Sequence, residues 1–516
     1  MKLDFARNTK RNIAAATVNK VMGLLFPFLN RTLFLWLMGP EYLGLNGLFT
    51  SVLGVLMLAD LGFGTAVVCS MYKPIADDDR DLVCAYLRFY RTVYRWVGAV
   101  IFTGGLFLLP FLSNLVHGTI PADINLHILY LIHLVNTSLS YFLFAYRGSV
   151  LNAYHRNDIL TNIHTATSIA QYLSVFLVLF ITRSYYCYIA VTVLFTVINN
   201  LLTVYEARRL FPNIEPRGDL AVVKRRQVVS DVKSIFMHKV GGVISNSVDN
   251  IVISAFLGLV AVAAYGNYYY VVTSVTGLIW AIYNSMTGGF GNKVHTDTKD
   301  DNFKLFMKAN RLTLIIIIGC SAVMLALYQP FIRIWTGNNP TLVRHALTPF
   351  LMVVYFFVNQ SRQPLLTFKA AASIWREDRW KPIVAGAANL AMNISFVLFL
   401  PDEYKLDGVV LSTILSYIII QMPWEAHVVF TVFFNKKQGF CYWLSQLRFA
   451  VAAIVICGST FGVVRLIPLD GPVGLLVDAA VATVASAGLV FCLFHRDVVE
   501  VLGCLRPQAR RASIGK

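Results

Sequence analysis

Charged side chains interrupt the long apolar stretches of the sequence at a few positions, and two of them are arginines. Arg31 lies in FPFLNRTLFLWLMG, and Arg362 lies among the polar residues of YFFVNQSRQPLLTFKA, close to a proline. A charge within an apolar helix is costly, so it faces a wet cavity or a partner inside a helix bundle. A guanidinium there can bind a phosphate through two parallel hydrogen bonds. We therefore predict that both arginines contact an anionic substrate, with a structural pair to Asp60 or Asp249 as the alternative for Arg31.

The two aspartates lie in similar apolar surroundings. Asp60 is in LADLGFGTA, and Asp249 precedes Asn250 in ISNSVDNIVISAF. A carboxylate at bilayer depth can bind a coupling ion, H⁺ or Na⁺, or it can neutralise an arginine in the same cavity. The sequence leaves both roles open, and it predicts no other cofactor and no metal site. We add Asn250 to the predicted substrate-binding residues, because an internal repeat aligns it with Arg31.

Lysines near the ends of the apolar stretches complete the candidates. We predict that Lys239 and Lys369 add positive charge to the substrate site. A lysine near a helix end can instead extend its ammonium group to the membrane surface. This alternative explains Lys20 and Lys239 equally well, and it applies to Lys369 too.

Long apolar helices must carry these residues. Hydrophobic residues make up 57% of the 516-residue chain and charged residues only 14%, whereas soluble domains carry about a quarter charged residues. Because about 20 apolar residues cross a bilayer as a helix, we predict an all-α polytopic membrane protein with about 14 transmembrane helices. The predicted spans are 13–38, 43–71, 93–115, 124–148, 160–182, 185–206, 233–258, 260–289, 307–335, 345–370, 382–400, 408–434, 444–467 and 473–495.

The loops between these spans alternate between basic and non-basic, which predicts the orientation. Most of the 44 lysine and arginine residues fall on the side of the N-terminus. Such residues concentrate on the cytoplasmic side of membrane proteins, so we predict that both termini are cytoplasmic. The net charge of +17 then reflects topology and not nucleic-acid binding. The loops on the opposite side hold only Arg183, Arg333, Arg344, Lys405 and Arg465.

An internal repeat appears when the chain is shifted by 219 residues against itself. The offset covers six spans, so the two repeats have the same orientation, as in parallel-repeat transporters that bind substrate between their lobes. We predict an N-lobe at 1–206, a cytoplasmic linker at 207–232, a C-lobe at 233–434, and two further spans with a cytoplasmic tail at 435–516. The aligned pairs include Lys20 and Lys239, Arg31 and Asn250, Gly39 and Gly258, and Gly47 and Gly266.

Enzyme signatures are missing from the sequence. It contains no H-E-x-x-H, G-x-S-x-G, Walker A or G-x-G-x-x-G motif, and its eight cysteines include no C-x-x-C pair. We interpret the acidic cluster Asp77 to Asp81 as a solvated turn. These features predict a transporter and not an enzyme.

Several segments resemble a known family. GPEYLGLNGLF at 39–49, LADLGFGTA at 58–66 and YKPIA at 72–76 are similar to polysaccharide-export flippases of the Wzx and teichuronic-acid-exporter types. These flippases belong to the multidrug/oligosaccharidyl-lipid/polysaccharide (MOP) exporter superfamily. VDNIVIS at 248–254 and PLLTFKAAASIWREDRWKP at 364–382 also resemble the group, whereas the last two spans match it only in hydropathy.

The resemblance implies two six-helix lobes, as in MATE transporters, around a cationic cavity. It also implies flipping of undecaprenyl-(pyro)phosphate-linked oligosaccharide from the cytoplasmic to the outer leaflet of a bacterial plasma membrane, for capsule or exopolysaccharide export. The implied partners are the lipid-linked glycan, membrane lipids, and a glycan polymerase or glycosyltransferases. One alternative is a cation-coupled multidrug exporter, although the buried charges are balanced or basic and not mainly acidic. A membrane glycan polymerase is a further alternative, although the outward loops are short.

Overall fold

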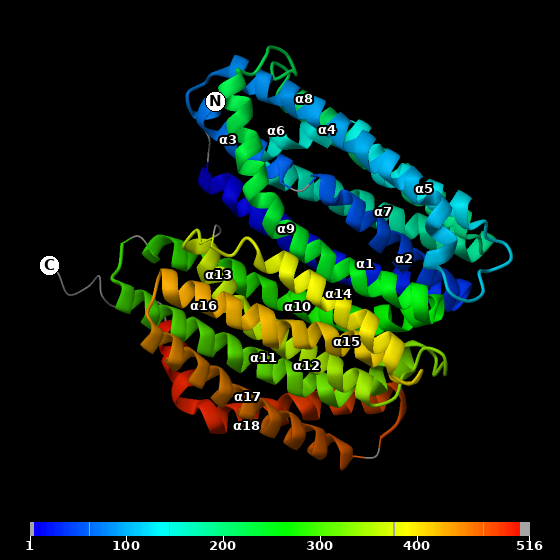
Figure 1. The fold of residues 1–516 in the computed structure, drawn as a ribbon, viewed down its shortest axis with the longest axis vertical. Coiled ribbons are helices and arrows are strands. Elements are labelled where there is room, and N and C mark those ends of the chain that lie inside the picture. The colour runs from blue at the N-terminus through cyan, green and yellow to red at the C-terminus, as the bar shows by residue number, and fades with distance from the viewer. Residues whose placement is uncertain are drawn as a thin grey trace. The chain divides into compact units, whose positions relative to one another are not determined.

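The computed structural model describes residues 5–60, 62–143, 145–294, 296–374, 377–467 and 469–505. The chain divides into two compact units, Met1–Gly266 and Asn267–Lys516, which we describe separately. All regular elements of the described residues are helices (Figure 1), which confirms the predicted all-α class. Within the described part of the chain, eight helices are long and apolar enough to cross a membrane: Arg80–Leu115, Asn157–Thr182, Tyr185–Leu210, Lys299–Trp335, Lys381–Phe399, Lys405–Val432, Lys436–Arg465 and Gly471–Asp497.

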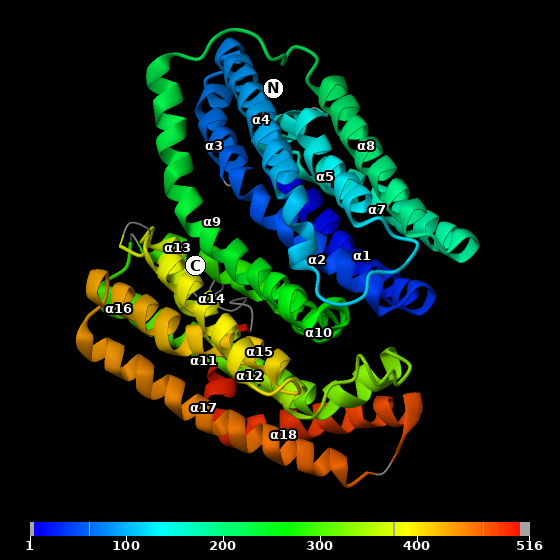
Figure 2. The same ribbon diagram turned by 45° about the vertical axis from the view of Figure 1, so that its right-hand side comes forward.

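Unit 1 is a bundle in which α1 packs against α7, α7 against α8, and α8 against α5 (Figures 1 and 2). Helix α4 packs against α5 and α3, and α9 packs against α2. Its α-helices are α1 (Phe5–Met38), α2 (Pro40–Leu56), α3 (Phe63–Ala76), α4 (Arg80–Leu108), α5 (Leu126–Phe142), α6 (Gly148–Ala153), α7 (Asn157–Thr182), α8 (Tyr185–Leu210), α9 (Val222–Leu257) and the start of α10 (Leu259–Val294). Short 3₁₀ helices are η1 (Met57–Asp60), η2 (Leu109–Leu115) and η3 (Ala145–Arg147).

The backbone conformation at two glycines supports the internal repeat. Gly39 separates α1 from α2 with φ 108° and ψ 173°, and Gly258 separates α9 from α10 with φ 87° and ψ 177°. Both conformations lie in a region that is essentially restricted to glycine. The repeat aligns these two glycines, so both helix pairs turn at the same point in the same way.

The two turns also pack closely within unit 1. A Cβ atom at Gly44 in α2 would collide with the backbone of Leu259. Because Gly44 has no side chain, α2 can approach the first turn of α10 directly. A small residue at the contact of two membrane helices commonly serves this purpose.

The predicted span 43–71 is not one continuous helix. Helix α2 ends at Leu56, η1 follows, and Gly62 adopts φ 102° before α3 begins at Phe63. Non-helical backbone at membrane depth is tolerated where protein or a cavity surrounds it. The sequence did not reveal the break, since single glycines are also frequent within continuous membrane helices.

The chain between α8 and α9 is held on unit 1 by two arginines. Arg147 is buried and donates to the carbonyl of Ile214 at 2.8 Å, and Arg88 donates to the carbonyl of Gly218 at 2.9 Å. The linker predicted at 207–232 therefore contains the end of α8, a loop anchored on these side chains, and the first turns of α9.

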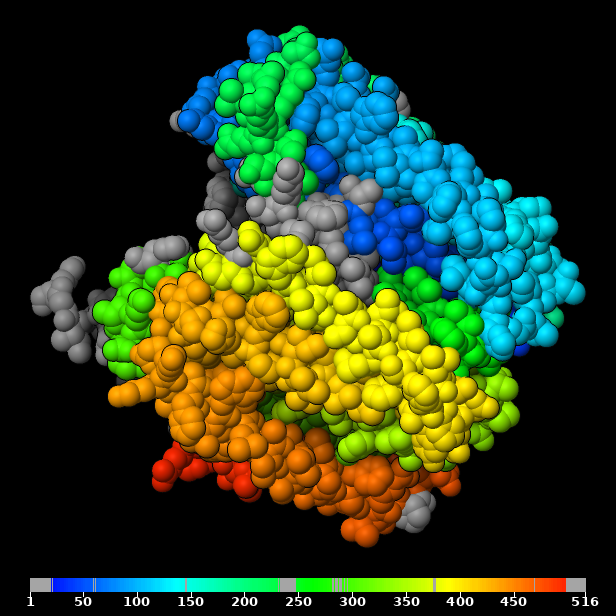
Figure 3. All heavy atoms as spheres, in the orientation of Figure 1, coloured from blue at the N-terminus to red at the C-terminus, as the bar shows by residue number. Residues whose placement is uncertain are grey.

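Unit 2 is organised around α11, which packs against α12, α17 and α18. Figure 3 shows α14 to α17 covering one face of this unit. After the remainder of α10, its α-helices are α11 (Lys299–Trp335), α12 (Leu347–Ser361), α13 (Gln363–Ala371), α14 (Lys381–Phe399), α15 (Lys405–Leu415), α16 (Met422–Val432), α17 (Lys436–Arg465) and α18 (Gly471–Leu505).

Two helices of unit 2 are irregular at points that carry polar or charged side chains. Helix α12 ends at Ser361 and α13 begins at Gln363, next to Pro364, so Arg362 lies at the junction. The predicted span 408–434 contains a π-helical segment, η4 (Ser416–Gln421), between α15 and α16. Single turns of π-helix inside α-helices occur frequently at functional sites.

Candidate functional site

Arg31 lies in unit 1, where α1 meets the first turns of α10. Its guanidinium is half-buried, and one NH₂ group donates to the carbonyl of Ala263 at 3.4 Å. A Cβ atom at Gly266 would lie 2.6 Å from that NH₂ group. The repeat aligns Gly266 with Gly47 of α2, and here the lack of a side chain makes room for the arginine.

A network of hydroxyl and amide groups fixes α1 and α2 on α5 and α8 near Arg31. The adjacent Asn30 donates to the Tyr188 hydroxyl at 3.4 Å. Tyr185 donates to Asn46 at 3.3 Å and lies 3.2 Å from the ring nitrogen of buried His133. Side-chain hydrogen bonds between helices restrict how those helices pack, so this network limits the orientations open to Arg31.

Asp249 and Asn250 bond to the neighbouring helices of unit 1. The buried Asp249 carboxylate accepts from the Tyr265 hydroxyl of α10 at 3.2 Å. Asn250 donates to the Ser51 hydroxyl of α2 at 2.9 Å. Both side chains therefore connect α9 to the two helices that follow the Gly39 and Gly258 turns.

Asp60 lies at the break between α2 and α3. Its Oδ2 atom accepts from the hydroxyls of Tyr94 in α4 at 3.4 Å and Tyr141 in α5 at 3.2 Å. A Cβ atom at Gly64 would lie 2.8 Å from the Tyr90 hydroxyl. The lack of a side chain at Gly64 therefore leaves room for the Tyr90 hydroxyl of α4.

Arg362 lies in a buried ion pair of unit 2. Its guanidinium donates two hydrogen bonds to Glu425, at 3.1 and 2.6 Å, and one to Gln421 at 2.7 Å. It also lies 4.3 Å from the centre of the Tyr417 ring. The π-helical segment carries both Gln421 and Tyr417, while Pro364 marks the helix junction on the other side.

Two lysines extend this ion pair into a network of five charged side chains. Lys381 bonds to Glu425 at 2.6 Å and lies 3.4 Å from Asp378. Lys369 is ion-paired with Asp378. All five side chains are at least 90% buried. We call Arg362, Lys369, Asp378, Lys381 and Glu425 the buried ion-pair network; its formal charge is +1 when all five are ionised.

Sequence reasoning missed the acidic members of this network. Glu425 lies inside the predicted span 408–434. Because a charge at bilayer depth is costly, this position should have made Glu425 a candidate site residue, as it did for Arg362. Asp378 and Lys381 lie in the short segment between two predicted spans and gave no comparable signal. The structure thus gives the predicted substrate residues Arg362 and Lys369 carboxylate partners that the sequence did not assign. Their contact with substrate stays a prediction.

The remaining lysine candidates differ in what the structure describes. Lys20 is exposed on α1. Lys239 lies in α9 within the stretch 233–246, outside the described side chains. The predicted substrate-binding role of Lys239 therefore stays a prediction as well. Among the described residues, no group of three or more His, Cys, Asp and Glu side chains could hold a metal ion.

Comparisons with known proteins identify similar sequences and folds. The sequence matches the family Polysaccharide biosynthesis protein over residues 9–286. No curated protein matches the chain. The fold is similar to that of lipid II flippase MurJ in an inward closed conformation, with a TM-score of 0.66 and 16% identity over 95% of this chain and 99% of that chain.

Two further similar structures are conformations of a multidrug resistance MATE family transporter of the MOP superfamily. The inward-facing structure has a TM-score of 0.58 and 14% identity, and covers 81% of this chain and 98% of its own. The outward-facing structure has a TM-score of 0.51 and 14% identity, and covers 81% and 95%. At these identities the solved structures establish the fold, and the match over more than half of the chain establishes the family.

Proposed function

Because the chain belongs to the polysaccharide biosynthesis protein family, we propose that it flips a lipid-linked oligosaccharide across the bacterial plasma membrane. The substrate is an undecaprenyl-(pyro)phosphate-linked oligosaccharide, and the movement is from the cytoplasmic to the outer leaflet by alternating access. The family match over residues 9–286 carries this proposal, since it includes Arg31, Asp60 and Asp249. The fold shared with a lipid II flippase supports it. Both termini lie in the cytoplasm in this account.

Arg31 is the residue to which we assign the substrate phosphate. Its guanidinium is half-buried and reaches past Gly266 to a backbone carbonyl, a weaker acceptor than an anion. Hydrogen bonds with an ionised partner are roughly twice as strong as neutral ones, so a phosphate can displace the carbonyl. Asn250, about two turns before the Gly258 break, is the second polar contact from the aligned helix.

We assign coupling to an ion gradient to the carboxylates. Asp60 combines a carboxylate, two tyrosine hydroxyls and a break in the helix. Binding of H⁺ or Na⁺ there changes which hydroxyl bonds the carboxylate can accept, at the point where the backbone is already irregular. Asp249 bonds to Tyr265 in the same way.

Reconstitution tests the proposal. The full chain is placed in liposomes with a fluorescent undecaprenyl-diphosphate oligosaccharide, and the fraction reaching the opposite leaflet is measured over time. We expect transport by the wild type, loss of transport with Arg31→Ala, and unchanged transport with Lys20→Ala, an exposed cation on the same helix. Transport of an organic cation drug in place of the glycan lipid would contradict the proposal and favour the MATE-like alternative.

A further inference from the structure

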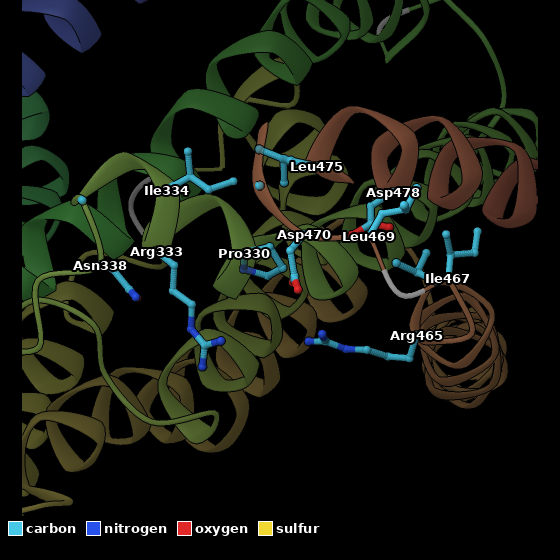
Figure 4. Close-up of a pocket in the computed structure, with 13 residues that line it drawn as sticks. Pro330, Arg333, Ile334, Asn338, Arg465, Ile467, Leu469, Asp470, Leu475 and Asp478 are labelled. Atoms are coloured by element: carbon cyan, nitrogen blue, oxygen red, sulfur yellow. The ribbon is translucent and has the colours of Figure 1, made fainter. Parts of the chain in front are cut away.

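A pocket of about 500 Å³ lies in unit 2, where the ends of α11 and α17 meet the start of α18 (Figure 4). Its volume falls within the range of ~300–1,000 Å³ typical of small-molecule sites. Two arginines, Arg333 and Arg465, and two aspartates, Asp470 and Asp478, line it together with apolar side chains. None of these four residues belongs to the buried ion-pair network or to the proposed substrate site.

Asp478 is the buried acid of this pocket. Its side chain is only 8% exposed, and its Oδ1 atom is buried and accepts no hydrogen bond from the described residues. A buried carboxylate without a donor costs several kcal/mol, so such a group normally has a cationic or hydrogen-bonding partner. The partner that would satisfy Asp478 is a ligand carrying N–H donors and a positive charge.

The two arginines present the opposite charge to the same pocket. Figure 4 shows Arg465 extending from the end of α17 toward Asp470, with Arg333 entering from α11. Among the ion pairs of the described residues, none joins either arginine to Asp470 or Asp478. Guanidinium groups bind phosphate oxygens through paired hydrogen bonds. The pocket thus offers separate cationic and anionic contacts to one occupant.

A second cavity beside the first is lined by the same two arginines and by a third. It has a volume of about 440 Å³, shares Arg333 and Arg465 with the first, and is also lined by Arg344. The Nε atom of Arg344 is buried without a hydrogen-bond partner among the described residues. Three of the five basic residues predicted on the outward loops therefore gather around the two cavities.

Exposed apolar side chains lie close in sequence to the residues that line the pocket. Leu466 is 81% exposed, Val473 71% and Leu476 72%, all on the helix ends that form the pocket. In a membrane-spanning chain such side chains face hydrocarbon. An occupant with a charged head in the pocket and acyl chains on this surface is compatible with both environments.

We propose that this pocket binds the zwitterionic headgroup of an aminophospholipid of the phosphatidylethanolamine type. The phosphodiester contacts Arg333 and Arg465, and the primary ammonium donates to Asp478 and Asp470. The bound lipid is a resident of the membrane and not the transported glycan lipid, so the inference goes beyond the proposed function. The predicted topology assigns the site to the outer leaflet.

Thermal unfolding of the purified full chain in detergent, with added lipid, tests the proposal. We expect phosphatidylethanolamine to raise Tm more than phosphatidylcholine or phosphatidylglycerol does. The quaternary ammonium of phosphatidylcholine has no N–H donor for Asp478, and phosphatidylglycerol has no cation. Soluble phosphoethanolamine should raise Tm by less than half as much; an equal rise would identify a soluble ligand and overturn the lipid assignment.

Variants of the pocket residues test which side chains cause the rise in Tm on lipid binding. Asp478→Asn should cancel the advantage of phosphatidylethanolamine over phosphatidylcholine, while leaving Tm in phosphatidylcholine unchanged or higher, because the unsatisfied charge is gone. The double variant Arg333→Gln with Arg465→Gln should reduce the response to all three lipids. Glu403→Gln, which changes an exposed carboxylate outside the pocket, should respond like the wild type. Equal responses of the wild type to phosphatidylethanolamine and phosphatidylcholine, or an ethanolamine preference that survives Asp478→Asn, would overturn the proposal.

Discussion

Arg31 in unit 1 and Arg362 in unit 2 both interrupt apolar helices, but their surroundings differ. Arg31 is half-buried and donates to a backbone carbonyl at 3.4 Å. Arg362 is 4% exposed and donates twice to Glu425. Removing one member of a buried ion pair leaves an uncompensated charge, whereas a half-buried arginine can exchange a neutral acceptor for an anion. The difference predicts that Arg31 and Arg362 have different roles, and it shows that depth in a helix alone does not determine how a charge is paired.

The largest expected effect is on stability in unit 2. Glu425→Ala removes the acceptor shared by Arg362 and Lys381, which leaves the three buried cations of the network with one carboxylate, Asp378. We expect a loss of about 3–5 kcal/mol in the free energy of unfolding, measured by denaturant titration in detergent micelles. Glu403→Ala, at an exposed position, is the control and should change stability by less than about 0.5 kcal/mol. Equal stability of the two variants would show that the ion pair of Arg362 with Glu425 does not stabilise the fold, and would contradict the distinction between Arg362 and Arg31.

Arg362→Ala should have a smaller effect on stability, because Lys381 still neutralises Glu425 at 2.6 Å. If Arg362 is structural, the amount of folded protein falls, and glycan-lipid transport per folded molecule stays near the wild-type rate. Transport is measured in liposomes and normalised to folded protein by size-exclusion chromatography. A transport loss greater than the loss of folded protein would support the sequence prediction that Arg362 contacts substrate.

Gly266→Ala tests whether the position of the Arg31 guanidinium affects substrate binding. The new Cβ atom would lie 2.6 Å from the Arg31 NH₂ group, so the guanidinium must move. We expect severalfold weaker substrate binding, equivalent to about 1 kcal/mol, with little change in stability. Gly291→Ala in the same helix is the matched control, because a Cβ atom there meets nothing within 4 Å. The same affinity in both variants would show that the position of Arg31 is unimportant.

Asp60→Asn should have only a modest effect on folding. The amide can still accept the hydroxyl bonds of Tyr94 and Tyr141, so the expected destabilisation is within about 0.5–1.5 kcal/mol, the net contribution of a hydrogen bond. The expected change is in coupling: transport no longer responds to an imposed H⁺ or Na⁺ gradient. Gradient-driven transport at the wild-type level in this variant would exclude Asp60 as the coupling residue.

The all-helical class, the family and the alignment of Gly39 with Gly258 were predictable from the sequence, because hydropathy, motifs and glycine positions are local properties. The partner of Arg362 was less accessible. Glu425 is 63 residues away, and the side chains meet only because the helix junction at Pro364 and the π-helical segment set their register. The helix break at Asp60 was also missed, since its glycines are compatible with a continuous membrane helix. Asp478, inside the predicted span 473–495, also interrupts an apolar stretch, but it was not among the predicted site residues.

Binding of an undecaprenyl-diphosphate oligosaccharide to folded protein tests the assignment of Arg31 most directly. Affinity is measured in detergent for Arg31→Ala and Arg362→Ala beside the wild type. The loss of a charge-assisted hydrogen bond, ~1.5–3 kcal/mol, predicts binding about tenfold to a hundredfold weaker for Arg31→Ala. The folded fraction of Arg362→Ala should bind like the wild type. Unchanged affinity in Arg31→Ala, with binding lost in Arg362→Ala, would contradict the account.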